Sequence, residues 1–194
     1  MKKLHVLVLV CALSTTSYTT SFAQKDAKKV ADKENDKKFN DKKEDDDFVV
    51  DAADGGLFEV QAAELSKTNA SSVKVKELAE MMIKDHSKAN EELKAIARKK
   101  NITLPTKLGD KNQKAFDKLT KLKGAEFDKE YADMMVSDHK EDIDMFQKEA
   151  DKGYDGELKA WAAGKLATLK HHLSMAESTK EAVKNSKTEP ISEK

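Results

Sequence analysis

The chain has 194 residues, a length typical of one domain, and its 36 lysines and arginines balance 36 aspartates and glutamates. A balanced charge argues against the strongly basic surfaces with which proteins bind nucleic acid or an anionic membrane. Cys11 is the only cysteine, so neither a disulfide framework nor thiol chemistry is expected.

Residues 1–23 have the pattern of a secretory signal peptide. Two lysines precede an apolar stretch from His5 to Leu13, and the segment ends in Ser21-Phe22-Ala23. The apolar stretch is too short to span a bilayer, and no later stretch is long enough either. We therefore expect cleavage near Ala23-Gln24, a periplasmic or secreted protein, and no transmembrane segment in the mature chain.

Two segments are expected to lack a fold of their own. Residues 24–47 mix acids and bases almost evenly, and Val30 and Phe39 are their only large apolar residues before Phe48. Such a composition buries too little apolar surface to fold, so we predict a charged disordered tether, with a solvent-exposed helix as the alternative. Residues 185–194, which include Pro190, are predicted to form a disordered tail.

The segment between them, 48–184, has a helical pattern throughout and no stretch with the two-residue period of a strand. We predict helices at 48–67, 72–100, 112–122, 125–151 and 155–184. Short turns join the long helices into two antiparallel hairpins, so the predicted fold class is all-α, a ferritin-like four-helix bundle. The short helix lies in the connection between long helices 2 and 3. That connection allows either a crossover along the bundle, as in ferritin-like proteins, or simple up-and-down order.

A six-residue motif occurs twice: MMIKDH, which ends at His86, returns as MMVSDH, which ends at His139. His86 shares a stripe with apolar residues at alternating spacings of three and four, the pattern of a buried helix face. The same spacing places His139 and Asp142 on one inward face of their helix. The aspartates that precede the two histidines are rotated by about 100° from this face and are expected to meet solvent or to support the histidines.

Two further polar residues fall on inward stripes. On the inward stripe of the first helix, Glu59 is the only acid and the other residues are small or apolar. On the last helix, either His171 or His172 can point inward. Glu59, His86, His139 and His172 each lie near the middle of their own helix, which predicts one polar layer at mid-bundle. A buried ionised carboxylate is costly unless it is paired or bound to a cation, so Glu59 needs a partner.

Carboxylates and imidazoles that project inward from several helices are the usual way to build a metal site in a bundle. The layer therefore predicts one transition metal ion (iron, manganese, zinc or copper), with the candidate ligands Glu59, His86, His139, Asp142 and His172. Met82 and Met135 would favour copper as ligands, but methionines at such positions more often fill the core. The alternative is a metal-free hydrogen-bonded layer that specifies helix pairing.

Several short segments together resemble a family of exported, ferritin-like bacterial proteins, catalogued as domain of unknown function 4142 and often labelled membrane or outer-membrane proteins. They are FEV at 58–60, MMIKDHSKAN at 81–90, LP at 104–105, FDKEY at 127–131, MMVSDH at 134–139 and LKHHL at 169–173. The resemblance implies a ferritin-like bundle of uncharacterised function rather than an activity. It also favours His172 over His171 as the inward residue.

The sequence departs from the ferritin-like di-iron enzymes, which carry a Glu-x-x-His pair on two helices. Ile83 and Leu169 stand three residues before His86 and His172, so a mononuclear site is the better expectation. No nucleophile elbow and no phosphate-binding glycine loop is present. We therefore expect an exported, non-enzymatic bundle that binds a transition metal. The alternatives are a metal-free envelope or stress-related interaction protein and, third, a redox enzyme; oligomeric state and protein partners stay open.

Overall fold

The computed structural model describes residues 26–36 and 43–185, and these residues form six helices and no strand. The predicted all-α class is thereby confirmed. The predicted signal peptide at 1–23 and all of the predicted tail after Asn185 lie outside the described residues. None of the described helices is long and apolar enough to cross a membrane.

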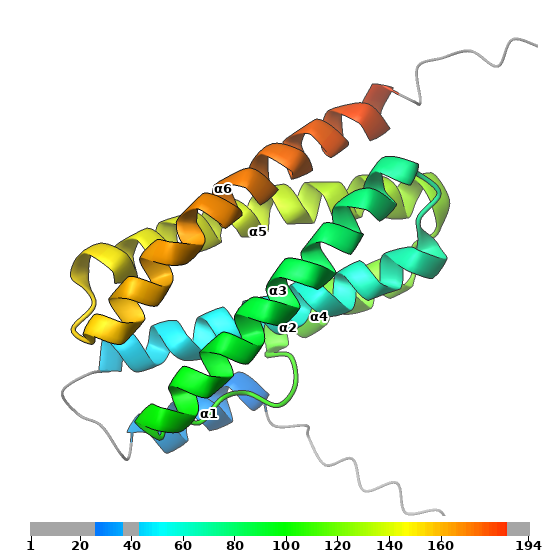
Figure 1. The fold of residues 1–194 in the computed structure, drawn as a ribbon. Coiled ribbons are helices and arrows are strands. Elements are labelled where there is room, and N and C mark those ends of the chain that lie inside the picture. The colour runs from blue at the N-terminus through cyan, green and yellow to red at the C-terminus, as the bar shows by residue number, and fades with distance from the viewer. Residues whose placement is uncertain (1–25, 37–42, 186–194) are drawn as a thin grey trace, which may run out of the picture.

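Four long helices form two hairpins (Figure 1). They are α2 (Lys43–Asn69) with α3 (Val73–Lys100), and α5 (Gly124–Lys152) with α6 (Gly156–Asn185). The short helix α4 (Asp110–Thr120) lies in the connection between α3 and α5, where a short helix was predicted. The observed bounds differ from the predicted ones by at most two residues, except at the start of α2.

Helix α2 begins at Lys43, five residues before the predicted start at Phe48. Its first turn holds Glu44, Asp45 and Asp46, and acids there interact favourably with the positive end of the helix dipole. Asp45 is also buried and accepts hydrogen bonds from the backbone N–H groups of Tyr154 (2.9 Å) and Asp155 (2.7 Å). Asp45 therefore belongs to the folded domain, where it holds the turn between α5 and α6, and not to a tether.

A further helix, α1 (Ala27–Asp36), lies within the stretch 24–47 that was expected to be disordered. It packs against α2, and its Ala31 and Asn35 are buried. The Asn35 side chain donates to the carbonyl of Thr103 (3.1 Å) and accepts from the N–H of Thr103 (2.8 Å). A buried amide and a buried alanine anchor this helix, and large apolar residues do not. Its composition therefore did not predict that it packs on the domain.

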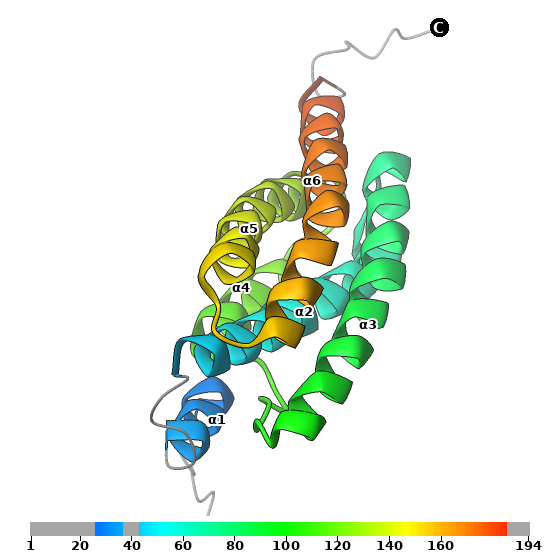
Figure 2. The same ribbon diagram turned by 60° about the vertical axis from the view of Figure 1, so that its left-hand side comes forward.

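The chain crosses the length of the bundle between α3 and α5. At one end, the Asn69 side chain donates to the carbonyl of Leu122 (2.9 Å), so α5 begins beside the turn between α2 and α3. At the other end, Lys100 forms an ion pair with Asp155 (2.7 Å), so α3 ends where α6 begins. Helices α3 and α5 therefore run parallel (Figures 1 and 2), which selects the crossover path over up-and-down order.

Asp54 of α2 holds the crossing segment in place. Its buried carboxylate accepts from the N–H of Gly109 (2.7 Å) and from the side chain of Asn112 (2.9 Å), at the start of α4. Helix α2 also continues without a break through Gly55 and Gly56. A Cβ atom on Gly56 would overlap the side-chain amide of Asn90, so this glycine lets α3 approach α2 closely at mid-bundle.

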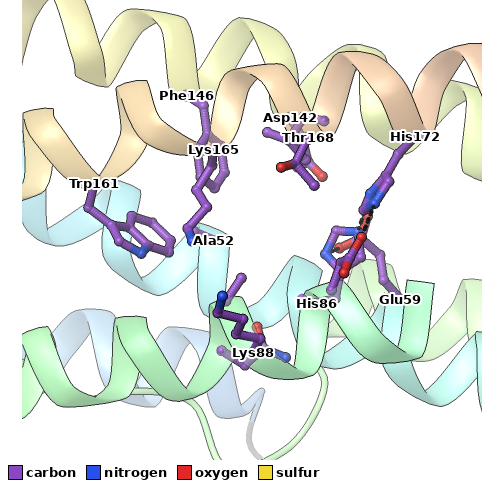
Figure 3. A pocket seen from close by; sticks show the side chains of 15 residues that line it. Ala52, Glu59, His86, Lys88, Asp142, Phe146, Trp161, Lys165, Thr168 and His172 are labelled. Atoms are coloured by element: carbon purple, nitrogen blue, oxygen red, sulfur yellow. Dashed lines mark hydrogen bonds and ion pairs between the residues drawn. The ribbon is translucent and has the colours of Figure 1, made fainter. Parts of the chain in front are cut away.

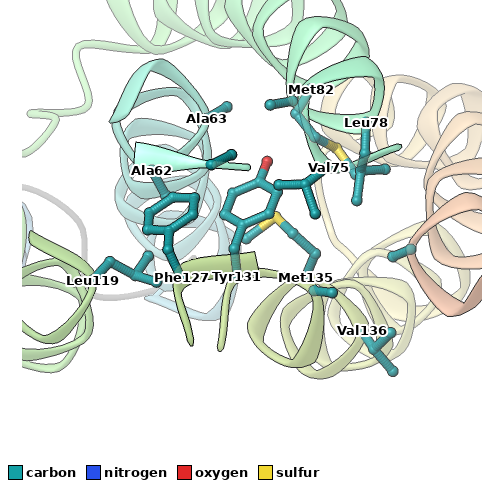
Figure 4. Packing of buried hydrophobic residues seen from close by; sticks show 14 of the residues in the cluster. Ala62, Ala63, Val75, Leu78, Met82, Leu119, Phe127, Tyr131, Met135 and Val136 are labelled. Carbon is teal, nitrogen blue, oxygen red and sulfur yellow. The ribbon is translucent and has the colours of Figure 1, made fainter. Parts of the chain in front are cut away.

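The core consists of two apolar clusters. The first surrounds Phe58, Met82, Tyr131 and Met135, near the turn between α2 and α3 (Figure 4), and the second surrounds Phe48, Leu93, Phe146, Leu158 and Leu169, near the turn between α5 and α6. On α3, α5 and α6 the candidate histidine falls between members of the two clusters, and on α2 Glu59 directly follows Phe58 of the first cluster. The polar layer therefore lies at mid-bundle, as predicted.

Replacement of Asp128 should test how the two hairpins are joined. Asp128 of α5 accepts from the N–H groups of Ser71 (3.1 Å) and Ser72 (2.8 Å) at the start of α3 and acts as its cap. Asp128→Ala should lower the free energy of unfolding by about 2 kcal/mol, measured by urea denaturation. The control Asp117→Ala, which removes an exposed bond from Gln113, should change it by less than about 0.5 kcal/mol. Equal effects would contradict this role.

Glu149 should make stability depend on pH. Burial, together with the negative charge of Asp45, raises the pKa of Glu149 to about 7. The folded state then binds more protons than the unfolded state between the ordinary pKa near 4.5 and about 7, so stability falls as pH rises through this window. Glu149→Gln removes this effect. The free energy of unfolding of the variant minus that of wild type should be roughly 1–3 kcal/mol larger at pH 8 than at pH 5. Urea denaturation at both pH values measures it. A pH-independent difference would refute the assignment.

Candidate metal centre

Each of the four long helices contributes one side chain to the polar layer. Glu59 comes from α2, His86 from α3, His139 from α5 and His172 from α6, and all four are buried, with exposed fractions of 7% or less. Figure 3 shows Glu59, His86 and His172 together. His171 is exposed, which settles the choice between the two neighbouring histidines in favour of His172.

The three imidazoles converge through one nitrogen each. Nδ1 of His172 lies 3.3 Å from Nε2 of His139 and 3.2 Å from Nε2 of His86. One ligand atom from each histidine lies within 4.8 Å of the others. Nitrogens bound tetrahedrally to zinc at about 2.0–2.1 Å are about 3.3 Å apart, so the spacings of His172 to His139 and to His86 are those of ligands of one ion. This buried histidine cluster can hold a metal ion.

The second nitrogen of each ring faces an oxygen. Nδ1 of His139 lies 2.9 Å from the carbonyl of Met135, and Nε2 of His172 lies 3.1 Å from a carboxylate oxygen of Asp85. A carbonyl or carboxylate oxygen only accepts, so these two ring nitrogens carry the hydrogen and donate. Histidines that bind metals are oriented by the same kind of outer hydrogen bond.

All three imidazoles are neutral at physiological pH. Burial lowers the pKa of His86 to about 4. Burial, with the proximity of His86 and His172, lowers the pKa of His139 to about 3. Burial also lowers the pKa of His172, although the hydrogen bond to Asp85 acts in the opposite direction. Neutral imidazole is the form that binds metals, so none of the three rings has to lose a net positive charge first.

Neutral rings with fixed outer hydrogens leave an unusual pair of nitrogens at the centre. Because His139 donates through Nδ1 and His172 through Nε2, the inner nitrogens of both rings carry lone pairs. These two lone pairs face each other across 3.3 Å, and neither ring has a hydrogen left to place between them. Two facing lone pairs repel, and a cation placed between them would turn this repulsion into two bonds.

Glu59 controls the third ring. Its Oε2 lies 2.7 Å from Nδ1 of His86, and its Oε1 lies 3.6 Å from Nε2 of His139. If Glu59 is ionised, Nδ1 of His86 donates to it, and Nε2 of His86 also presents a lone pair to the centre. If Glu59 is protonated, it donates to Nδ1, and Nε2–H of His86 donates to His172 instead. The protonation of Glu59 therefore sets the tautomer of His86.

Glu59 itself is held in an unfavourable environment. Burial and the negative charge of Asp138 raise its pKa well above the ordinary value, and burial and the charge of Glu59 do the same for Asp142. Oε1 of Glu59 is buried and has no hydrogen-bond partner among the described residues. An unpartnered buried carboxylate oxygen that faces a ring of lone-pair nitrogens is suited to be a fourth ligand.

The other residues of the repeated motif take different places. Asp142 is partly buried and lies next to Glu59 rather than within the histidine cluster. Met82 and Met135 are fully buried in the first apolar cluster, consistent with a filling role, and Met135 reaches the site through its backbone carbonyl.

Sequence reasoning did not assign Asp85 to His172. Asp85 was expected to meet solvent or to support a histidine, and it supports one on a different helix, α6. Only the arrangement of α3 against α6 brings these two residues together. Its place beside His86 in the motif was the one available signal.

A pocket of about 150 Å³ adjoins the cluster between α3 and α6 (Figure 3). Glu59, His86 and His172 form one end of it. Its remaining polar lining includes Lys88, Asn90, Lys165 and Thr168. A metal ion held by the histidines would therefore face a space large enough for a few water molecules or a small ligand.

Comparison with known families adds one match. The family described as "Domain of unknown function (DUF4142)" matches residues 23–179, which is most of the chain. The chain belongs to this family. The DUF4142 match includes Glu59, Asp142 and the three histidines of the buried cluster. The resemblance found in the sequence is confirmed. No curated protein and no solved structure matches the chain.

The polar layer of this DUF4142 chain should lower the stability of the metal-free protein. Replacement of a buried polar pair by apolar residues of similar size is often stabilising, by about 1–4 kcal/mol. The double variant Glu59→Leu/His86→Leu should therefore unfold at higher urea concentration than wild type in the presence of a chelator. The single variant His86→Leu, which leaves Glu59 without its partner, should be less stable than the double variant. His171→Leu serves as the exposed control. A double variant less stable than wild type would show that the layer stabilises the bundle without metal.

Proposed function

We propose that this protein binds one first-row transition metal ion at mid-bundle, through His86, His139 and His172, with Glu59 as the fourth ligand. The observation that carries the proposal is the pair of lone-pair nitrogens of His139 and His172, 3.3 Å apart and both anchored from outside. A hydrogen-bonded layer without a metal would place a donor between these two atoms.

The ligand atoms follow from the anchoring bonds. Nε2 of His86, Nε2 of His139 and Nδ1 of His172 would bind the ion, and Oε1 of Glu59 would complete the set. Three imidazoles and a carboxylate suit iron, manganese, zinc or copper, and the single carboxylate suits one ion better than two. Asp142, next to Glu59, is a further candidate where the ion takes a higher coordination number.

Such an ion would supply Lewis acidity or, for iron, manganese and copper, a change of oxidation state. The chain itself holds the imidazole rings in fixed orientations. Asp85 and the carbonyl of Met135 orient His172 and His139, while Glu59 orients His86. The apolar clusters on both sides limit the access of water to the layer, so the imidazoles stay neutral and available.

The helix order supports a relationship to ferritin-like proteins. Two antiparallel hairpins joined by a connection that crosses the length of the bundle form a ferritin-like path, and the metal layer would lie where such bundles hold their ions. We further propose that the protein acts outside the cytoplasm, after removal of residues 1–23. The export pattern of these residues supports this location.

Metal binding should be tested on purified protein stripped with chelator and then titrated with Zn²⁺ and Co²⁺. We expect one ion per chain and a rise in unfolding free energy of about 2.7 kcal/mol at a free metal concentration of one hundred times Kd. His139→Ala should weaken binding at least tenfold, because it removes a ligand. His171→Ala, one residue from His172 but exposed, should bind as wild type does.

The rival hypothesis, a metal-free envelope or stress-related interaction protein, predicts a different result. On that view His139→Ala changes stability to the same extent with and without metal, and wild type takes up no stoichiometric ion. This outcome would reject the metal centre. An expressed protein that remains in the cell lysate with residues 1–23 attached would reject export.

A further inference from the structure

A second, larger cavity lies on the other side of Glu59. It has a volume of about 570 Å³ and is bounded by α2, α5, the start of α4 and the region around Lys28. Eight carboxyl groups and two lysines line it. We call it the acidic chamber. Glu59 and Asp142 line both the acidic chamber and the pocket beside the histidines, so they form the partition between the two spaces.

The carboxyl groups of the acidic chamber become less exposed toward the histidines. Asp110 and Glu141 are exposed, with side-chain exposures of 59% and 61%. Asp138 and Asp142 are partly buried, and Glu59 is 2% exposed. On α5, Glu141 and Asp142 follow Asp138 by three and four residues, so the three side chains line one face of this helix. Together these residues form a graded series of oxygen ligands from the surface to the metal layer.

The lysines of the chamber form their ion pairs with carboxylates other than Asp138, Asp142 and Glu59. Lys28 forms ion pairs with Asp51 (2.9 Å) and Asp32 (3.3 Å), and Lys111 pairs with Glu141 (2.6 Å). Within the described part of the chain, no lysine forms an ion pair with Asp138, Asp142 or Glu59. A cleft in which one sign of charge predominates raises the local concentration of ions of opposite charge. The excess of eight carboxyl groups over two lysines therefore favours cations in the chamber.

Two oxygens at the inner end lack the partners that buried groups normally have. Oε1 of Glu59 and Oδ2 of Asp138 are buried and accept no hydrogen bond from any described residue. Asp54, in contrast, uses both oxygens to hold the start of α4 and is part of the framework. The free oxygens thus belong to the residues nearest the histidines, where a passing cation would need ligands to replace its water.

We propose that the acidic chamber is the entry site for the metal: a hydrated divalent cation binds to Glu141, Asp138 and Asp142 and passes Glu59 to reach the histidines. This inference rests on the proposed metal centre. The carboxylates replace water ligands one after another, and the ion moves toward the imidazoles because borderline transition metals bind nitrogen ligands more tightly than carboxylates alone. The pocket on the other side holds Lys88 and Lys165 beside Asp85, so its lining carries both signs of charge and favours cation entry less.

The rate of metal uptake tests this route separately from the affinity. Stopped-flow absorption should follow Co²⁺ as it enters the nitrogen site of the full chain without residues 1–23. For Asp138→Asn/Glu141→Gln we expect the association rate constant to fall about tenfold at low ionic strength, with a weaker salt dependence, because electrostatic steering is lost. The Kd should change less than threefold, since neither residue is a ligand of the final site at the histidines.

Two comparisons sharpen the test. Glu177→Gln/Glu181→Gln on α6 changes the net charge by the same amount outside the chamber and should leave the rate within twofold of wild type. Lys111→Gln removes a positive charge from the rim and should increase the rate. Circular dichroism checks that each variant is folded.

The two proposals fail in different ways. If wild type binds no Co²⁺ at equilibrium, the metal centre itself is wrong. If wild type binds Co²⁺ but the chamber variant loads at the wild-type rate, or the α6 control slows equally, the entry route is overturned and the metal centre stands.

Discussion

The centre of this bundle is organised by the outward hydrogen bonds of three buried imidazoles. Met135, Asp85 and Glu59 each engage the outer nitrogen of one ring, and this leaves the inner nitrogens to face one another. Buried polar groups are normally satisfied, and a group left without a partner costs about 1–3 kcal/mol. The bundle keeps this arrangement because two apolar clusters on either side supply the packing that the layer does not.

The fold explains how four distant residues meet. A crossover between α3 and α5 makes these helices parallel, and the caps supplied by Asp45, Asp54 and Asp128 hold the ends of the hairpins and the crossing segment together. Carboxylates that accept backbone hydrogen bonds thus fix the helix ends, while the carboxylates of the inner chamber have no such bonds. The difference separates acids that build the framework from acids that face a solvent-filled space.

The polar layer lies between two spaces of different character. One is small and lined by both lysines and carboxylates, and the other is larger and rich in carboxylates. Glu59 takes part in three roles at this boundary, because it sets the tautomer of His86, offers an oxygen to the centre and closes the inner end of the acidic chamber. Its conformation and protonation would therefore connect the proposed metal binding with access to the site.

Helical periodicity by itself determined the class of fold, the four long helices and the depth of Glu59, His86, His139 and His172, because each of these depends on spacing within one helix. Tertiary structure decided what depends on contacts between helices: the crossover, the choice of His172, the pairing of Asp85 with a ring on another helix, and the packing of α1 through Asn35. The inner and outer nitrogens of each ring were also beyond the sequence, since a ring's orientation follows from neighbours that lie far away along the chain.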